Sequence, residues 1–211
     1  MKGRFITFEG GEGSGKTTQI KLLAQTLRRR GHRVVVTREP GGTTLADRIR
    51  RLLLDRNFRG MGAMTELFLY EASRHTHVEK IIRPALQKGA FVLCDRFTDA
   101  TLAYQGYARG LPLAWVRRCN EWATRGLKPD VTYWLDLPPD QGLQRARRRE
   151  KCKAGRWDRL ERESLRFHRL VRKGYQKIQS QDRRRVVQIA ASLSPQEIQR
   201  RIWGICEARF L

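Results

Sequence analysis

Short apolar runs alternate with amphipathic stretches along the chain, and this alternation predicts an α/β fold. The apolar runs, rich in β-branched and aromatic residues, are typical of strands buried in a parallel sheet; they cover residues 5–8, 34–36, 90–94, 131–137 and 185–190. Between them apolar residues recur every three or four positions, which predicts helices; these follow residue 17 and cover 45–54, 64–87, 113–125, a stretch opened by Pro138–Pro139, a stretch from 158, and one from 195. Strand, helix and strand in succession form a βαβ unit, so we predict a doubly wound parallel sheet.

The first predicted strand leads directly into a glycine-rich loop. Residues 10–17 read GGEGSGKT and fit the phosphate-binding pattern G-x-x-x-x-G-K-[ST]. Glycines let backbone N–H groups approach phosphate oxygens, and the following helix adds the positive end of its dipole. Lys16 could bridge the β- and γ-phosphates, and the hydroxyl of Thr17 could bind Mg²⁺. We therefore expect ATP or GTP to bind at Gly10, Gly11, Glu12, Gly13, Ser14, Gly15, Lys16, Thr17 and Thr18.

Charged residues stand where the second and third predicted strands end. The second strand runs into Thr37-Arg38-Glu39-Pro40-Gly41, and the third into Asp95-Arg96-Phe97. Ligands of open α/β sheets bind beyond the carboxyl ends of the strands, so these residues are candidates for a site. Residues 98–109 mix small, hydroxyl-bearing and aromatic side chains, which favours a binding segment. The alternative for both loops is a capping turn with solvated charges.

Composition narrows the class of protein. The 211 residues suit a single domain, 1–211, with a mobile basic insert. No apolar run is long enough for a membrane span, and the four cysteines form no C-x-x-C pair, which argues against a metal site or a disulfide scaffold. The net charge of +23 suggests a nucleic-acid partner, but the basic residues are scattered over several helices. An anionic small molecule would also benefit from a positive field, so we expect no nucleic-acid or membrane partner.

Four segments in this order resemble thymidylate kinases of the P-loop nucleoside monophosphate kinases. They are FEGGEGSGKTT, TREPGGT, CDRFTDATLAYQGYARGL and a basic segment ending in GRWDRLERES. The resemblance extends from about Phe5 to about Ile205. It implies a five-stranded parallel sheet of order 2-3-1-4-5, a mobile lid at about 145–160, and transfer of a phosphoryl group from MgATP to dTMP. It further implies a cytoplasmic enzyme for dTTP synthesis that forms a homodimer through helices including residues 64–87.

The resemblance also implies a role for each matching side chain. Lys16, Arg38 and Arg96 would act on the transferred or acceptor phosphate, and Thr17 and Asp95 would hold Mg²⁺. Glu9 would orient the glycine-rich loop, and Glu39 would order its own loop or a metal-bound water. The acceptor nucleotide would contact Glu12 at its 3′-hydroxyl and Tyr104 at C2′, with its base held by Phe68, Arg74, Thr101 and Gln105. We also expect a cis Glu39–Pro40 bond.

The glycine-rich loop carries Glu12 and no arginine. Among thymidylate kinases this resembles the bacterial kind, in which the catalytic arginine comes from the lid. The candidates are Arg145, Arg147, Arg148, Arg149, Arg156 and Arg159, of which we favour Arg149 and Arg156.

Three positions depart from the family pattern. Ser73 stands where an acid is common, Ala100 where serine or asparagine is common, and residues 188–191 read QIAA where an aspartate is common. The first two concern the base pocket and the third the surroundings of the adenine.

Two other functions remain open on the sequence. One is a kinase for another monophosphate or for a deoxynucleoside, whose hydroxyl would need a general base such as Glu39 or Asp95. The other is a nucleic-acid-binding P-loop ATPase, which would show polynucleotide-stimulated hydrolysis and salt-sensitive binding.

Overall fold

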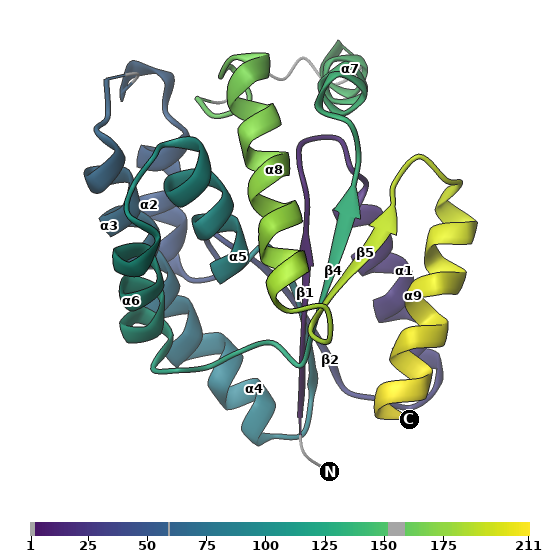
Figure 1. Cartoon of the computed structure of the whole chain (residues 1–211). Helices are drawn as coiled ribbons and strands as arrows, with labels where there is room; N and C mark the ends of the chain where they lie inside the picture. Colours follow the sequence, from purple (N-terminus) through teal and green to yellow (C-terminus); the bar gives the residue numbers. More distant parts are fainter. Residues whose placement is uncertain (1–2, 59, 152–158) are drawn as a thin grey trace.

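A five-stranded parallel sheet of order β2-β3-β1-β4-β5 lies at the centre of the computed structural model, which describes residues 3–58, 60–151 and 159–211 (Figure 1). The strands are β1 (Arg4–Glu9), β2 (Val34–Arg38), β3 (Phe91–Asp95), β4 (Val131–Asp136) and β5 (Val186–Ala190). All four pairings are parallel. The predicted doubly wound sheet and its strand order are confirmed.

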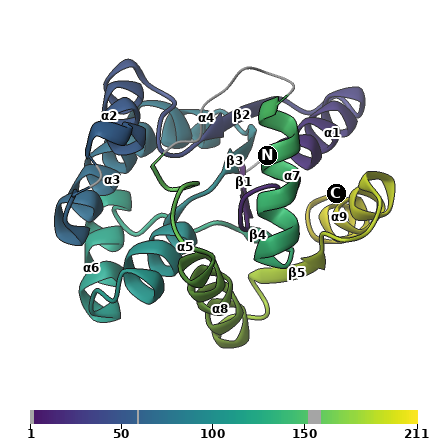
Figure 2. The same cartoon turned by 90° about the horizontal axis from the view of Figure 1, so that it is seen from above.

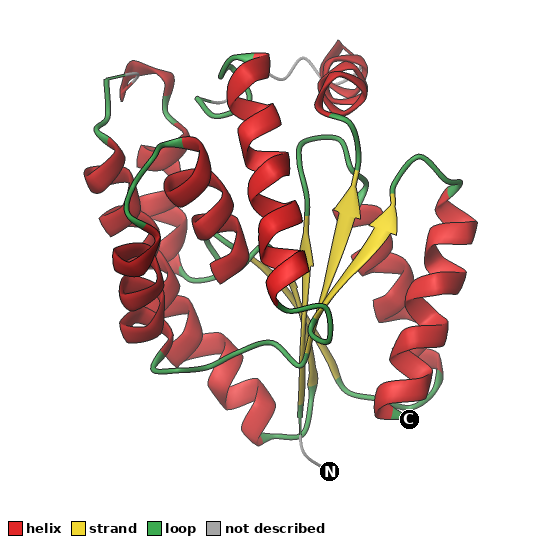
Figure 3. Ribbon diagram, viewed as in Figure 1, coloured by secondary structure: helices red, strands yellow, loops and turns green. Residues whose placement is uncertain are grey.

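Helices follow each strand and cover both faces of the sheet (Figure 3). The α-helices are α1 (Lys16–Arg29), α2 (Thr44–Leu54), α3 (Ala63–His77), α4 (Arg83–Gln87), α5 (Thr98–Thr101), α6 (Leu113–Thr124), α7 (Pro139–Lys151), α8 (Leu165–Gln181) and α9 (Pro195–Phe210). Two π-helical segments, η2 (Val78–Ile82) and η3 (Leu102–Ala108), and a short 3₁₀ turn, η1 (Arg56–Phe58), complete the elements. None of the helices in the described ranges combines the length and the apolar character that a membrane crossing needs.

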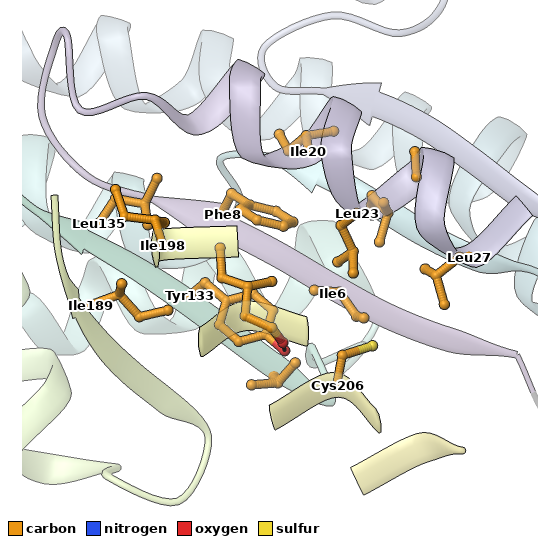
Figure 4. Close-up of a cluster of buried hydrophobic side chains, with 14 of the residues drawn as sticks. Ile6, Phe8, Ile20, Leu23, Leu27, Tyr133, Leu135, Ile189, Ile198 and Cys206 are labelled. Carbon is orange, nitrogen blue, oxygen red and sulfur yellow. Dashed lines mark hydrogen bonds between the residues drawn. The ribbon is translucent and has the colours of Figure 1, made fainter. Parts of the chain in front are cut away.

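The core has a separate cluster on each face of the sheet. On one face, Ile20 and Leu23 of α1 pack against Ile6 and Phe8 of β1, and all four are at most 2% exposed (Figure 4). On the other face α8 and η3 pack against β4, where Trp134 stacks on Tyr175 with ring centroids 6.1 Å apart. Because both faces are covered, the strands are apolar throughout, as the sequence pattern indicated.

The long helix predicted over residues 64–87 is continuous but not uniform. Its middle turn, η2, is π-helical and lies immediately before Pro84. Proline has no N–H, and its ring would clash with the carbonyl four residues earlier in an α-helix. A wider turn at this point accommodates the proline without ending the helix.

Helix α7 differs from the prediction. The sequence favoured a flexible basic segment from Arg145 onward, but residues 145–151 continue α7. Helix α8 starts at Leu165, where the side chain of Ser164 accepts a hydrogen bond from Phe167 N, and not at Asp158. Seen from above, α7 lies over the edge of the sheet where the strands end, between α1 and α8 (Figure 2). This position brings α7 to the glycine-rich loop.

Candidate active site

A cavity of about 420 Å³ opens at the carboxyl ends of β1, β2 and β3. Its walls come from the loops after these strands, from α3, α5 and η3, and from α7. Six basic side chains face it, against four acidic ones. The basic ones are Lys16, Arg38, Arg50, Arg74, Arg96 and Arg145; the acidic ones are Glu12, Glu39, Asp95 and Glu161. The excess of positive charge suits an anionic ligand.

The glycine-rich loop forms the floor of this cavity. Its glycines adopt positive φ angles, 66° at Gly13, and a side chain there would meet the carbonyl oxygen of Gly142 of α7 at 2.2 Å. Glycine is therefore required where α7 approaches the loop. Lys16 is buried and donates to the carbonyl oxygens of Gly10 and Gly11 at 3.1 and 3.0 Å. Burial lowers the pKa of its ammonium group.

Thr17 and Asp95 meet beside the loop, although 78 positions separate them in sequence. The hydroxyl of Thr17 donates to Asp95 Oδ2 at 3.2 Å. The structure thus brings the two predicted Mg²⁺ residues together. No group of three or more His, Cys, Asp or Glu that could hold a metal ion occurs within the described ranges. Two hard oxygen ligands fit Mg²⁺, which usually takes one or two protein ligands and completes its shell with phosphate oxygens and water.

Arg96 is held in an unusual backbone conformation at the end of β3, with φ at 69°. Its Nη2 donates to Glu12 Oε1, and its Nη1 lies 3.0 Å from the hydroxyl of Tyr104. The guanidinium carbon also lies 4.9 Å from the centre of the Tyr104 ring. Burial works against the charge, but the nearby acidic groups keep the pKa of Arg96 well above its usual value. A positive φ in an arginine is rare and is tolerated where the surroundings fix it, often at functional sites.

Glu39 lies at the centre of a buried charge cluster behind the β2 loop. Its carboxylate accepts from Arg74 Nε at 2.7 Å and contacts His77 Nδ1 at 3.0 Å. Burial alone would raise its pKa, but Arg74 and His77 more than offset this and hold the pKa of Glu39 below its usual range. The Glu39–Pro40 bond is cis, as predicted. Glu39 therefore orders its own loop.

Arg74 makes four hydrogen bonds in this cluster. Beyond Glu39 it donates to Glu71 Oε1 at 2.8 Å, to Asn120 Oδ1 at 2.7 Å and to the carbonyl of Phe97 at 3.2 Å. A guanidinium has five N–H groups, so these contacts leave one N–H of Nη2 for the cavity that Arg74 lines.

The predicted base pocket is formed by Thr101, Tyr104 and Gln105, which line the cavity and are at most 4% exposed. Gln105 Nε2 donates to Glu66 Oε1 at 2.6 Å, so the glutamine is fixed from behind. Thr101 Oγ1 is buried without a hydrogen-bond partner within the described part of the chain. A buried hydroxyl beside a cavity without a protein partner suits a ligand's polar group.

The prediction for Phe68 is wrong in its placement. Phe68 is 59% exposed and does not line the cavity, whereas Tyr70 does. On a helix, residues four apart share a face and residues six apart do not. Tyr70, four positions before Arg74, therefore faces the cavity, and Phe68 points away from it. The helical phase relative to Arg74 was the signal that could have identified Tyr70.

Glu9, at the end of β1, connects the loop region to two other elements. Its carboxylate accepts from Phe97 N and Ala100 N at 2.7 and 3.3 Å, and from the hydroxyl of Tyr175 at 2.7 Å. Burial, with Asp99 nearby, raises the pKa of Glu9 to about 7. Glu9 thus fixes the start of α5 and one side of α8 relative to β1.

The candidate lid arginines separate into three groups. Arg145 lines the cavity and donates to the carbonyl of Ala191 at 3.0 Å. Arg159 is 5% exposed and pairs with Glu66 Oε2 at 2.5 Å, so it is used in the structure and does not face the cavity. Arg147 and Arg148 are exposed on α7. The two favoured candidates lie outside the described residues: the side chain of Arg149 and the whole of Arg156.

Arg38 faces the cavity from the end of β2. Its side chain is 57% exposed, and Nη2 contacts Asp47 Oδ1 at 3.3 Å. Arg50 of α2, which the sequence did not single out, lines the same wall and donates to the carbonyl of Pro40 at 3.0 Å. It belongs to the site only because α2 folds back over the β2 loop, and no local pattern marks it.

Comparisons with known proteins bear on the same residues. Residues 8–202 match the family model described as "Thymidylate kinase". Thymidylate kinase of Geotalea uraniireducens (strain Rf4) is 53% identical over 208 residues, which cover 98% of each chain. That of Synechococcus sp. (strain JA-2-3B'a(2-13)) is 51% identical over 205 residues, 97% of this chain and 95% of its own. A crystal structure of thymidylate kinase from Ehrlichia chaffeensis has a TM-score of 0.78 at 32% identity and covers 98% of this chain and 99% of its own.

Proposed function

This chain belongs to the thymidylate kinase family, and from that membership we propose how its residues transfer the γ-phosphoryl group of ATP to dTMP. The products are dTDP and ADP. The cavity between the glycine-rich loop and the η3 segment supports this reaction, because it has a phosphate-binding floor at one end and a buried polar pocket at the other. That single cavity with two different ends is the observation on which the proposal depends.

The donor triphosphate binds to the glycine-rich loop. Lys16 leaves the carbonyls of Gly10 and Gly11 to contact the β- and γ-phosphates, and Arg145, which packs beside Gly13, adds positive charge on the same side. Thr17 and Asp95 hold Mg²⁺, directly or through water. When bound, Mg²⁺ neutralises charge on the phosphates.

The acceptor dTMP occupies the other end of the cavity. Its base lies beside Tyr70, with the free N–H of Arg74 and the unpartnered hydroxyl of Thr101 facing its polar edge. Tyr104 closes the pocket against the sugar and excludes a ribose 2′-hydroxyl. Arg96 exchanges Glu12 for the acceptor phosphate, and Glu12 then accepts from the 3′-hydroxyl.

The transfer needs no general base. The attacking atom is a phosphate oxygen whose second pKa is about 6, so it is largely ionised at neutral pH. The site has instead to hold two repelling anions in line and to stabilise charge on the transferred group. Lys16, Arg96 and Arg38 are the cations of the described chain that face the cavity from the ends of β1, β3 and β2 and suit this task.

A coupled assay of ADP release tests the assignment. With MgATP and a panel of dTMP, dUMP, dCMP, dGMP and thymidine, we expect dTMP to give the highest kcat/KM. A Lys16→Met variant purified in the same way reports any contaminating kinase. No turnover with dTMP, combined with ATP hydrolysis stimulated by polynucleotides, would refute the proposal in favour of a nucleic-acid-dependent ATPase.

We also infer a homodimer formed through α2, α3 and α6, which lie next to one another along one edge of the molecule (Figure 2). Large hydrophobic side chains are exposed on all three: Leu45, Leu52, Phe68, Trp115 and Trp122, each at least 46% exposed. Contiguous apolar surface of this kind marks interaction sites.

Sedimentation velocity tests the homodimer. We expect wild type at about twice the 24.6 kDa chain mass and Phe68→Glu as a monomer, because the glutamate would be buried unpaired in the interface. Leu211→Glu, at an exposed hydrophobic position at the opposite side of the molecule, should leave the dimer intact. A monomeric wild type at micromolar concentration would contradict the inference.

Unpaired thiols support a reducing, cytoplasmic place of action. Cys94, Cys119 and Cys206 are free, and the first and last are buried. Disulfides are rare in the cytoplasm because thiols are kept reduced there.

A further inference from the structure

His168 is a buried polar residue that none of the roles above uses. It lies in the first turns of α8, is 5% exposed, and packs edge-on against the ring of Phe167 with centroids 5.6 Å apart. Its Nε2 is buried and has no hydrogen-bond partner within the described ranges. Because a buried polar atom without a partner is costly, such an atom in a native protein calls for an explanation.

A second, small cavity lies between α8 and the glycine-rich loop. Its volume is about 20 Å³, enough for one water molecule. His168 lines it from α8, and Gly11 and Glu12 line it from the loop. Glu12 also lines the large cavity. The carboxylate of Glu12 thus lies between the acceptor site on one side and the small cavity of His168 on the other.

The charge environment of His168 agrees with this placement. Burial lowers the pKa of its imidazole, while Glu12 acts to raise it and Arg96 to lower it further. The imidazole is therefore neutral at neutral pH and close to the Glu12–Arg96 pair. A neutral imidazole has one N–H donor and one acceptor nitrogen, and a carboxylate is the natural acceptor for that donor.

We infer that His168 is a positioning residue that holds the carboxylate of Glu12 toward the 3′-hydroxyl of the acceptor nucleotide, directly or through one water in the small cavity. This inference rests on the proposed function, in which Arg96 leaves Glu12 to bind the acceptor phosphate. At that point Glu12 loses the partner on Nη2 that it has in the structure. The N–H of His168 is the donor placed on its other side.

Acceptors with and without a 3′-hydroxyl distinguish this role from a purely structural one. We expect His168→Phe to lower kcat/KM for dTMP about tenfold, the effect of one hydrogen bond to a charged group. For 3′-deoxythymidine 5′-monophosphate, which gives Glu12 no hydroxyl to accept from, the variant should stay within about twofold of wild type. His168→Gln places an amide near the position of Nε2 and should restore most of the activity with dTMP, whereas the shorter His168→Asn should not.

A double-mutant cycle provides the second arm. In a Glu12→Gln background, His168→Phe should add little further loss, because residues that act through one another are not additive. An equal loss on both acceptors, or additive losses in the cycle, would overturn the inference and leave His168 a core residue. Thermal melting checks that each variant folds, and His168→Leu replaces His168→Phe if the latter does not. Wild type inactive on dTMP would refute the proposed function, whereas an active wild type with an unaffected His168→Phe would refute only this inference.

Discussion

Replacement of Arg96 by alanine should lower kcat/KM for dTMP about a thousandfold, or about 4 kcal/mol of transition-state stabilisation. Arg96 is the buried cation that lies between the glycine-rich loop and the acceptor pocket, held by Glu12 on one side and Tyr104 on the other. In a site screened from water its charge stabilises the phosphoryl group far more than a surface arginine could. The loss should fall on kcat as well as on KM, because the group acts on the transferred charge.

A matched control separates this effect from a general loss of arginine. Arg117 of α6 is exposed and contacts only Gln181 among its printed partners, at 3.0 Å; Arg117→Ala should keep wild-type kinetics. Arg96→Lys should recover part of the activity, since lysine keeps the charge but lacks the planar fork that binds two oxygens at once. Turnover of Arg96→Ala within about fivefold of wild type, in a protein with an unchanged melting temperature, would refute the role.

Residues that one continuous segment brings together were predictable from sequence. Gly10 to Thr17 form the phosphate-binding loop within eight positions, and strand ends gave Arg38 and Asp95 because parallel strands end at one edge of the sheet. The contacts that give these side chains their chemistry join distant segments, however. Arg96 meets Glu12 across 84 positions, and Gln105 meets Glu66 across 39. Spacing along the chain carries no information on such pairs.

Local errors had local physical causes. Phe68 was chosen over Tyr70 because its aromatic character was considered and its helical phase was not. The arginine-rich stretch from Arg145 was expected to be flexible because of its charge. In the structure residues 145–151 remain helical, since the exposed side of α7 lets Arg147 and Arg148 stay solvated while Ala146 is buried. The π-helical turns of η2 and η3 are not visible in apolar periodicity, which tolerates one extra residue.

The second large effect concerns stability. Arg74→Met should lower the free energy of unfolding by about 3 to 5 kcal/mol, because it leaves a buried carboxylate cluster without its cation. Arg74 is 2% exposed and pairs with both Glu39 and Glu71, whose side chains are 3% and 9% exposed. Methionine keeps much of the volume, so the loss reports the stranded charges and not a cavity. Urea denaturation at pH 7.5 measures it.

The pH dependence shows whether the stranded charges are the cause. In wild type the pKa of Glu39 is depressed, so its stabilisation is present at neutral pH and is lost only as pH falls through the native value. In Arg74→Met, burial of Glu39 and Glu71 without the guanidinium should raise their pKa values above those of the unfolded chain. Protonation then relieves the penalty, so the deficit relative to wild type should shrink as pH is lowered from neutral to about 5. Arg30→Met, which breaks an exposed pair with Glu207, should cost below about 1 kcal/mol at any pH. A deficit in Arg74→Met that does not change with pH would show that lost packing, and not unpaired charge, destabilises the variant.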